Sequence, residues 1–101
     1  MSIRDNASVM SAALNKKEIS AVELTNQHYE QIAAVDKDVH AFLYLDKEGA
    51  LSQAAAVDKK RAAGEKLSPL AGVPLALKDV MTQKGIPTTC GSKILEGWRP
   101  P

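Results

Sequence analysis

The sequence is poor in the features that quickly assign a protein to a class. It has a single cysteine, Cys90, so it cannot form an internal disulfide, and a reducing compartment is expected. Its 13 basic and 12 acidic residues leave a formal charge of +1, which offers no electrostatic footprint for nucleic acid or an anionic membrane. No apolar run approaches the length of a membrane span, and Met1 to Asp5 lack the pattern of a signal peptide. We therefore expect a soluble cytoplasmic protein.

Large apolar side chains are also scarce. Hydrophobic residues make up 45% of the chain, but many of them are alanines. The aromatic residues are Tyr29, Phe42, Tyr44 and Trp98. A large side chain buries far more apolar area than an alanine, so the core of this 101-residue chain should be thin. We interpret the thin core as a sign that the chain is incomplete.

Two helices are expected in the first part of the chain. Asp5 or Asn6 can cap a short first helix, and Asn15 could close it in a left-handed conformation. The second helix has a firmer start, because Ser20 to Glu23 read as a capping box, and it should end near Asp36. One broad side of this second helix should be buried. That side carries Ala21, Val22, Leu24, His28, Tyr29, Ile32 and Val35.

A third helix is expected from Asp46 to Gly64, with a stripe of small residues that implies close packing. Before it, residues 40–45 could be extended or form a short turn. Asp58 lies on the stripe and should need a hydrogen-bonding partner if buried, so we expect a structural role for it. The basic cluster Lys59–Arg61 complements the helix dipole, an interpretation that we prefer to nucleic-acid contact.

An apolar run follows a turn-rich connector. Val73 to Val80 is almost unbroken, and its length and flanks favour a buried strand. A strand that is apolar on both faces needs neighbouring strands and a layer on each side, as in an α/β sheet. The rest of the chain supplies no convincing partner strands, and Gly85 to Ser92 should form a loop. The fold class we expect is therefore α/β, incomplete in this chain.

Lys78 interrupts that apolar run. Lysines are rarely buried without a partner, and desolvation lowers the pKa of a fully buried amine by up to about 3–5 units. Such an amine can act as a general base near neutral pH. In the alternative interpretation, Lys78 lies at the end of the strand with its amine in water. The spacing alone favours that alternative.

Other chemistry-bearing residues have simpler interpretations. Cys90 lies in a glycine-flanked loop and could be a thiol nucleophile, but no sequence signature ties either histidine to it, so a small buried or half-buried residue is favoured. His28 lies on an apolar helical face, as expected of a hydrogen-bonded core histidine, and His40 has no discriminating context. Asp79 should point away from Lys78 and hold the following loop.

A combined motif is more specific than any of these residues. Pro69 to Asp79 (PLAGVPLALKD), followed by Lys84 to Leu95 (KGIPTTCGSKIL), resembles the start of the amidase-signature family. Within it, the chain is most similar to the A subunits of glutamyl-tRNA(Gln) or aspartyl-tRNA(Asn) amidotransferases. Ser20 to Leu24 and Ala41-Phe42 extend the similarity over nearly the whole chain.

The resemblance implies the N-terminal part of a single amidase domain, in which a mixed sheet is covered by helices. Residues 5–64 would be the helical part, residues 65–72 a connector, and residues 73–101 the first core strand and a loop. It also implies a Ser–cis-Ser–Lys triad whose lysine is Lys78, while both serines lie beyond Pro101. Ser68 and Ser92 are not expected to replace them, so the isolated chain should be inactive.

The resemblance further implies an activity and partners. Glutamine would be hydrolysed, and the ammonia would be passed to a partner that converts Glu-tRNA(Gln) to Gln-tRNA(Gln). B and C subunits are the implied partners, and tRNA would be contacted mainly through the B subunit. ATP and Mg²⁺ would be used on the B subunit, and no cofactor or metal is expected in this chain.

Two other functions stay open. A stand-alone amidase of the same family would act on other carboxamides. A non-catalytic helical binding module would use the three helices alone. In a free chain, an exposed apolar strand would favour aggregation or strand pairing between copies.

Overall fold

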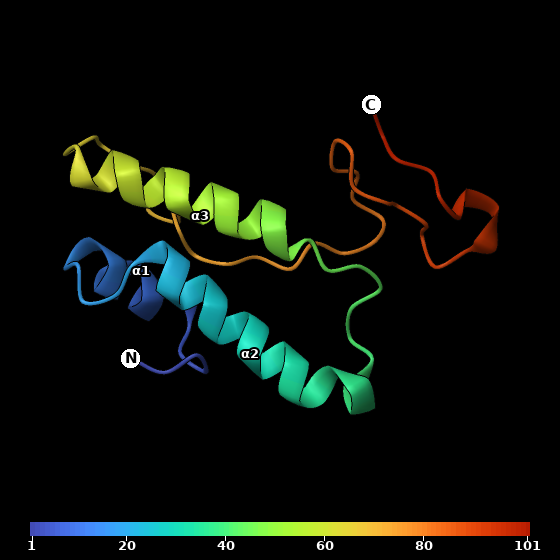
Figure 1. Ribbon diagram of the computed structural model, residues 1–101, viewed down its shortest axis with the longest axis horizontal. Helices are drawn as coiled ribbons and strands as arrows, with labels where there is room; N and C mark the ends of the chain where they lie inside the picture. Colours follow the sequence, from blue (N-terminus) through green and yellow to red (C-terminus); the bar gives the residue numbers. More distant parts are fainter.

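The computed structural model describes residues 1–101 and contains three α-helices and one short 3₁₀ helix. They are α1 (Ala7–Asn15), α2 (Ala21–Val39), α3 (Lys47–Ala62) and η1 (Lys93–Leu95). α2 packs against α3, α1 lies beside the start of α2, and the C-terminal loops extend away from the helices (Figure 1). No helix combines the length and the hydropathy needed to cross a membrane.

The start of α2 is fixed by local and tertiary contacts. Ser20 Oγ accepts a hydrogen bond from the Glu23 N–H at 3.0 Å, and Glu23 Oε2 accepts one from the Ser20 N–H at 2.9 Å, so the predicted capping box is confirmed. Asp58, from α3, accepts hydrogen bonds from the N–H groups of Ala21 at 2.7 Å and Val22 at 3.0 Å. The four N–H groups that a helix start leaves free are therefore all paired here. The structural role predicted for Asp58 is confirmed.

α1 begins as predicted but closes differently. Of the two candidate caps, Asn6 is the one used, because its side chain accepts a hydrogen bond from the Val9 N–H at 3.1 Å. Asn15 is the last helical residue, but the left-handed conformation falls on Lys17, with φ +58°. The N–H groups of Lys17 and the residue after it bond to carbonyls of the last turn, which satisfies the end of the helix without Asn15 leaving it.

The end of α2 lies beyond the predicted position. The helix continues past Asp36 to Val39, where His40 takes a left-handed conformation with φ +53° and its N–H bonds to the Asp36 carbonyl at 2.7 Å. A left-handed residue stops a helix wherever it falls, and no glycine marks that position in the sequence. α3 starts at its predicted cap, Asp46, and ends at Ala62, close to the predicted end.

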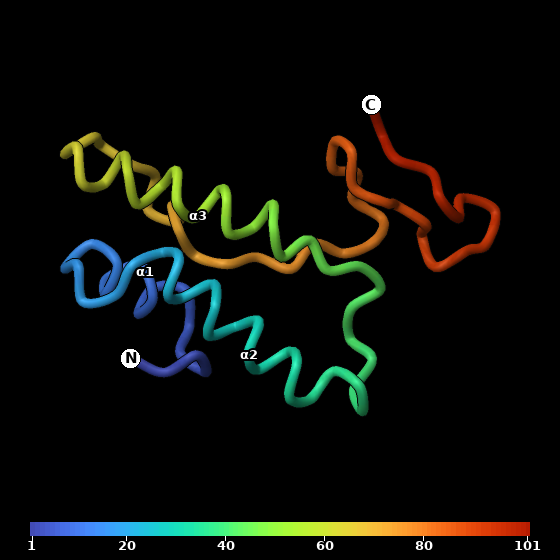
Figure 2. The backbone as a smooth tube through the Cα atoms, in the orientation of Figure 1, coloured from blue at the N-terminus to red at the C-terminus, as the bar shows by residue number.

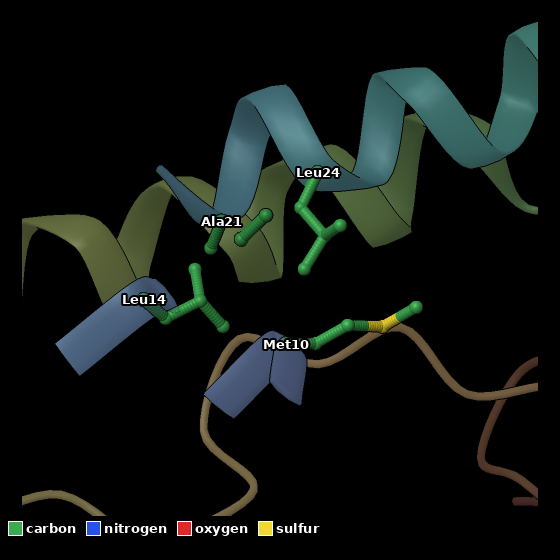
Figure 3. Close-up of a cluster of buried hydrophobic side chains, with 5 residues drawn as sticks. Met10, Leu14, Ala21 and Leu24 are labelled. Carbon is green, nitrogen blue, oxygen red and sulfur yellow. The ribbon is translucent and has the colours of Figure 1, made fainter. Parts of the chain in front are cut away.

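A small core lies where α1, the start of α2 and α3 meet. Only 9 of the 101 residues are buried, so the prediction of a thin core is confirmed. Figure 3 shows the central side chains, with Met10 and Leu14 of α1 facing Ala21 and Leu24 of α2. The C-terminal half of the predicted buried face of α2 is less covered, and Val35 is 39% exposed, because no other part of the chain packs over it.

The predicted strand from Val73 to Val80 does not form. Residues 73–78 contain no helix, turn or paired strand, and in Figure 2 they run as an orange tube between α2 and α3. A strand requires a hydrogen-bonded neighbour, and the only bridge in the chain is the isolated pair Gln83 and Ile86. The expected burial is absent as well, since Leu75 is 81% exposed. These 101 residues are thus three helices without a sheet, and the α/β core expected for them is not present.

The remaining segments are turns and loops, in line with the sequence. The predicted turn-rich connector contains two turns, closed by hydrogen bonds from Ala71 to Ser68 and from Val73 to Leu70, each at 3.0 Å. Residues 40–45 have no regular structure.

The C-terminal loops form a small lobe of their own. The Gly85 N–H donates to the Pro100 carbonyl at 2.8 Å, and Arg99 Nη1 donates to the Gly85 carbonyl at 2.7 Å. In the same lobe, the Thr88 N–H donates to the Trp98 carbonyl at 3.3 Å. These contacts tie the end of the chain back to the loop that was predicted between Gly85 and Ser92.

Candidate functional site

Lys78 lies at the end of the unpaired segment, where it is exposed. It lines an open groove of about 810 Å³, whose walls come from α2, α3, the 41–46 loop and residues 72–79. His28 and Phe42 are among the residues that share this groove with Lys78. The burial of the amine that a catalytic role calls for is not supplied by residues 1–101. The assignment of Lys78 as a catalytic residue stays a prediction.

The segment that leads to Lys78 is pinned at its start by Gly72. Gly72 has φ +89°, a conformation that side-chain-bearing residues rarely adopt. A Cβ atom at this position would lie 3.0 Å from the Cβ of Ala21, 3.3 Å from Cδ1 of Leu14 and 3.4 Å from Cγ1 of Val57. The backbone therefore crosses all three helices in near contact, which only glycine permits. Lys78 follows six residues after this fixed point.

Arg61 fastens the connector at the same place. Its Nη2 donates to the Ala71 carbonyl at 2.9 Å, and its Nη1 donates to Oδ1 of Asn15 at 2.6 Å. Arg61 lies in the last turn of α3, as predicted, but interpreting it only as a charge that complements the helix dipole overlooked this anchor. The available signal was its position three residues after Asp58, which places both side chains on neighbouring parts of one helical face.

Asp79 pins the other end of the segment. Its carboxylate accepts hydrogen bonds from the Thr89 N–H at 2.9 Å, from the Thr89 hydroxyl and from the Gly91 N–H at 3.1 Å. The prediction that Asp79 holds the following loop is confirmed. The hydroxyl bond of Thr89, followed by its backbone bond, holds the pKa of Asp79 below its ordinary value. Burial opposes them, and the bond from the Gly91 N–H makes the smallest contribution to the lowering. Lys78 is thus flanked by two fixed points, Gly72 and Asp79.

Cys90 belongs to the loop that Asp79 holds. It is exposed rather than buried or half-buried, its φ is +53°, and its N–H donates to the Asp79 carbonyl at 3.2 Å. No hydrogen bond joins its thiol to a histidine. Nδ1 of His28 lies 2.8 Å from the Leu24 carbonyl, so the expected hydrogen bond is present, but the residue is half-buried rather than part of the core. His40 is the residue that ends α2. A thiol–imidazole pair is therefore not assembled in these residues.

The two serines nearest the motif serve local turns. Ser92 caps η1 by accepting a hydrogen bond from the Ile94 N–H at 3.3 Å, and Ser68 accepts one from the Leu70 N–H at 3.4 Å. Neither hydroxyl is hydrogen-bonded to Lys78. No group of three or more histidine, cysteine, aspartate or glutamate residues lies together in a way that could hold a metal ion. Within this chain, the arrangement can position an amine but brings no nucleophile to it.

Comparison with known proteins adds information that these contacts lack. The sequence matches the family described as Amidase over residues 23–101. It is 63% identical over 99 residues to the A subunit of the glutamyl-tRNA(Gln) amidotransferase of Acidothermus cellulolyticus, and 62% identical to the corresponding protein of Streptomyces avermitilis. Each match covers 98% of this chain and 20% of the relative. The chain thus spans about a fifth of the length of the curated relatives it matches.

A solved structure shares the helical arrangement. It comes from work on an unexpected vestigial protein complex and the evolutionary origins of an s-triazine catabolic enzyme. The two chains superpose with a TM-score of 0.90 at 32% sequence identity, over 96% of this chain and 21% of the other. The backbone path of the three helices and of the segment after them therefore also occurs inside a much longer protein.

Proposed function

We propose, from the premise that this chain belongs to the amidase family, that it carries the catalytic lysine of a glutaminase that supplies ammonia to a tRNA-dependent amidotransferase. The observation that carries the proposal is the 63% identity, over 98% of the chain, to the A component of a glutamyl-tRNA(Gln) amidotransferase. The overall reaction would convert Glu-tRNA(Gln) to Gln-tRNA(Gln). Lys78 is the residue proposed to act in the glutaminase step.

In the proposed mechanism, the neutral amine of Lys78 takes a proton from a serine on a cis peptide, which in turn takes the proton of a nucleophilic serine. The nucleophile attacks the carboxamide carbon of glutamine, and the proton held by Lys78 passes back to the amide nitrogen, so that the C–N bond breaks, ammonia leaves and an acyl-enzyme remains. Water then attacks the acyl-enzyme and releases glutamate. A hydroxyl is a weak nucleophile, so it needs this base and a set of fixed donors for the oxyanion. Both serines would lie outside residues 1–101.

The local structure supports a positioning role for this chain in such a site. The anchors at Gly72 and Asp79 hold the ends of the segment that carries Lys78. In a complete amidase domain, we propose that this segment becomes a strand of a mixed sheet. The layers over that sheet would then remove the amine of Lys78 from water, as its use as a base requires.

Partners are part of the proposal. The relatives are named as one lettered component of an amidotransferase, which supports a multi-subunit enzyme. B and C subunits are the proposed partners, and ATP and Mg²⁺ would bind to the B subunit together with the main tRNA contacts. None of these groups is assigned to residues 1–101.

The test is the release of ammonia from glutamine by the full-length protein that contains this sequence. Lys78→Ala should lower kcat by about 10²–10⁴-fold, the usual contribution of a general base, with unchanged far-UV circular dichroism. Lys66→Ala removes an exposed lysine of the connector and serves as the matched control, with activity unchanged. Activity of Lys78→Ala within a few-fold of the parent would contradict the assignment.

The isolated chain provides a second test. Residues 1–101 should release no measurable ammonia from glutamine, because they hold no nucleophile beside Lys78. Turnover by the purified chain that disappears on Lys78→Ala would show that this expectation is wrong.

A stand-alone amidase is the second candidate. It is kept because the solved structure that shares this fold comes from work on the evolutionary origins of an s-triazine catabolic enzyme, not on an amidotransferase. Co-purification of the full-length protein with a B subunit, and glutaminase activity stimulated by Glu-tRNA(Gln), would support the amidotransferase. Hydrolysis of other carboxamides without either property would support the stand-alone amidase. A 1–101 chain that is monomeric, cooperative in unfolding and fully ordered would favour the third candidate, a helical binding module.

A further inference from the structure

We propose that Thr89 is a positioning residue of the proposed glutaminase site, because it holds the carboxylate of Asp79 away from the amine of Lys78. The inference rests on the proposed function, in which Lys78 must be neutral to accept a proton. A carboxylate close to a lysine favours the charged ammonium form. Asp79 follows Lys78 directly in the sequence, so its carboxylate is the nearest candidate for such an ion pair. The contacts of Asp79 prevent this pairing.

The carboxylate of Asp79 is occupied by donors from another loop. Oδ1 accepts a hydrogen bond from the Thr89 N–H at 2.9 Å, while Oδ2 accepts one from the Thr89 hydroxyl and one from the Gly91 N–H at 3.1 Å. The hydroxyl oxygen of Thr89 also accepts a hydrogen bond from the Gly91 N–H at 3.2 Å, so it links the two donors. No hydrogen bond joins the carboxylate to Lys78. Its charge is therefore stabilised without the adjacent amine.

The loop that supplies these donors is itself fixed. Thr88 is only 3% exposed, and the Ser92 N–H donates to the Thr89 carbonyl at 3.0 Å. The Cys90 N–H donates to the backbone carbonyl of Asp79 at 3.2 Å, which adds a second tie between the two segments. The carboxylate and its donors lie at most 12 residues apart in the chain. The contact therefore needs no part of the protein outside these residues.

The other carboxylate that lines the groove is occupied in a similar way. The titratable groups that share the groove with Lys78 and Asp79 are His28, Tyr29, Tyr44 and Asp46. Asp46 caps α3 and accepts a hydrogen bond from the Gly49 N–H at 3.1 Å. Histidine and tyrosine side chains carry no negative charge at neutral pH. Asp79 is thus the carboxylate whose release would favour the charged form of Lys78, and Thr89 is the side chain that holds it.

The test is the pH dependence of kcat/KM for glutamine hydrolysis by the full-length protein that contains this sequence. The acid limb of this profile reports the base that must lose a proton in the free enzyme, here assigned to Lys78. Thr89→Val removes the hydroxyl at nearly constant size, so the midpoint of the acid limb should rise by about 0.5–1 pH unit. Below the midpoint, kcat/KM should fall about 3- to 10-fold, while the plateau at higher pH stays close to that of the parent. Thr89→Ser restores the hydroxyl and should restore the midpoint.

A double variant separates the effect of charge from that of shape. In Thr89→Val combined with Asp79→Asn, no negative charge remains to be released, so the midpoint should return to that of the parent or lie below it. Thr82→Val is the matched control, since this exposed threonine makes no side-chain hydrogen bond, and its profile should match that of the parent. Far-UV circular dichroism checks the fold, and Thr89→Ala removes the same hydroxyl if Thr89→Val does not fold.

A second readout needs no turnover. Acetic anhydride in trace amounts reacts only with a neutral amine, so the pH midpoint for acetylation of Lys78, measured by peptide mass spectrometry, should also rise in Thr89→Val. A lower plateau without a shift of either midpoint, or an equal shift in the double variant, would overturn the proposal. Activity of Lys78→Ala within a few-fold of the parent would instead contradict the proposed function, and the acetylation midpoint would still decide whether Thr89 holds Asp79 away from Lys78.

Discussion

Replacing Asp58 by alanine should destabilise the fold by about 2–4 kcal/mol. The carboxylate accepts hydrogen bonds from Ala21 at 2.7 Å and from Val22 at 3.0 Å, and it is the only tertiary partner of these two N–H groups. A hydrogen bond to a charged group contributes about 1.5–3 kcal/mol, and a negative charge at a helix start adds about 0.3–1 kcal/mol. Two effects reduce the sum: water can reach this half-buried site, and alanine gains up to about 0.7 kcal/mol of helix propensity in α3.

The assay is urea denaturation of the 1–101 chain followed by far-UV circular dichroism. Domains of this size have free energies of unfolding of about 0.05–0.15 kcal/mol per residue, and the 9 buried residues place this chain at the low end. Asp58→Ala should therefore keep only a small part of the parent's free energy of unfolding and unfold at a much lower urea concentration. Asp58→Asn keeps one acceptor oxygen, so its free energy of unfolding should lie between those of the parent and Asp58→Ala.

Glu30→Ala is the control for charge alone. Glu30 is exposed on α2 and makes no side-chain hydrogen bond, so its removal should change the free energy of unfolding by less than about 0.5 kcal/mol. The reasoning is refuted if Asp58→Ala unfolds at the same urea concentration as the parent, or if Glu30→Ala costs as much as Asp58→Ala.

Three further predictions concern the anchors of the segment. Gly72→Ala should lower the free energy of unfolding by about 1–3 kcal/mol, because alanine would be strained at this φ and would contact its neighbours too closely. Gly64→Ala is the control, since Gly64 has φ +76° but open surroundings and so adds the strain alone. Urea denaturation of both variants separates the two effects. Arg61→Ala should expose the connector, seen as faster amide exchange in residues 70–72 with α2 unchanged. The pKa of Asp79 is lower in the folded state than its ordinary 3.8, so its contribution to stability is complete above pH 3.8 and is lost as the pH falls through the folded value. The Thr89 amide resonance should therefore titrate with a midpoint below 3.8, and a midpoint above 3.8 would contradict the hydrogen bonds to Asp79.

Features that depend on neighbouring residues could be predicted from the sequence. The capping box at Ser20 and the cap at Asp46 follow from side chains that bond within three residues, and Asp79 holds the loop that follows it, through Thr89 ten residues further on. The end of α2 could not be predicted in this way. His40 adopts the left-handed conformation there without being a glycine, and no local rule selects it over its neighbours.

Features that depend on distant partners were missed or mistaken. The run that begins at Val73 has the composition of a central strand, but a strand needs a ladder, and no other part of this chain supplies one. The bond from Arg61 to Ala71 joins residues brought together only by the packing of α1, α2 and α3. The catalytic role of Lys78 rests on family resemblance and stays a prediction, because its expected partners do not occur in these residues.

The close packing at Gly72 also divides the chain into a loop whose length can change and a segment whose length cannot. Arg61 bonds to the carbonyl of Ala71, and Gly72 packs closely against three helices, so the loop between Gly64 and Ala71 ends at a fixed position. Residues inserted near Gly64, where the surroundings are open, would change only the loop before Ala71. The distance from Gly72 to Lys78 is set only by the six residues 73–78. Insertions and deletions in the loop should therefore leave the place of the lysine unchanged, while a single residue added between Gly72 and Lys78 would displace it by about 3.3 Å, one strand step.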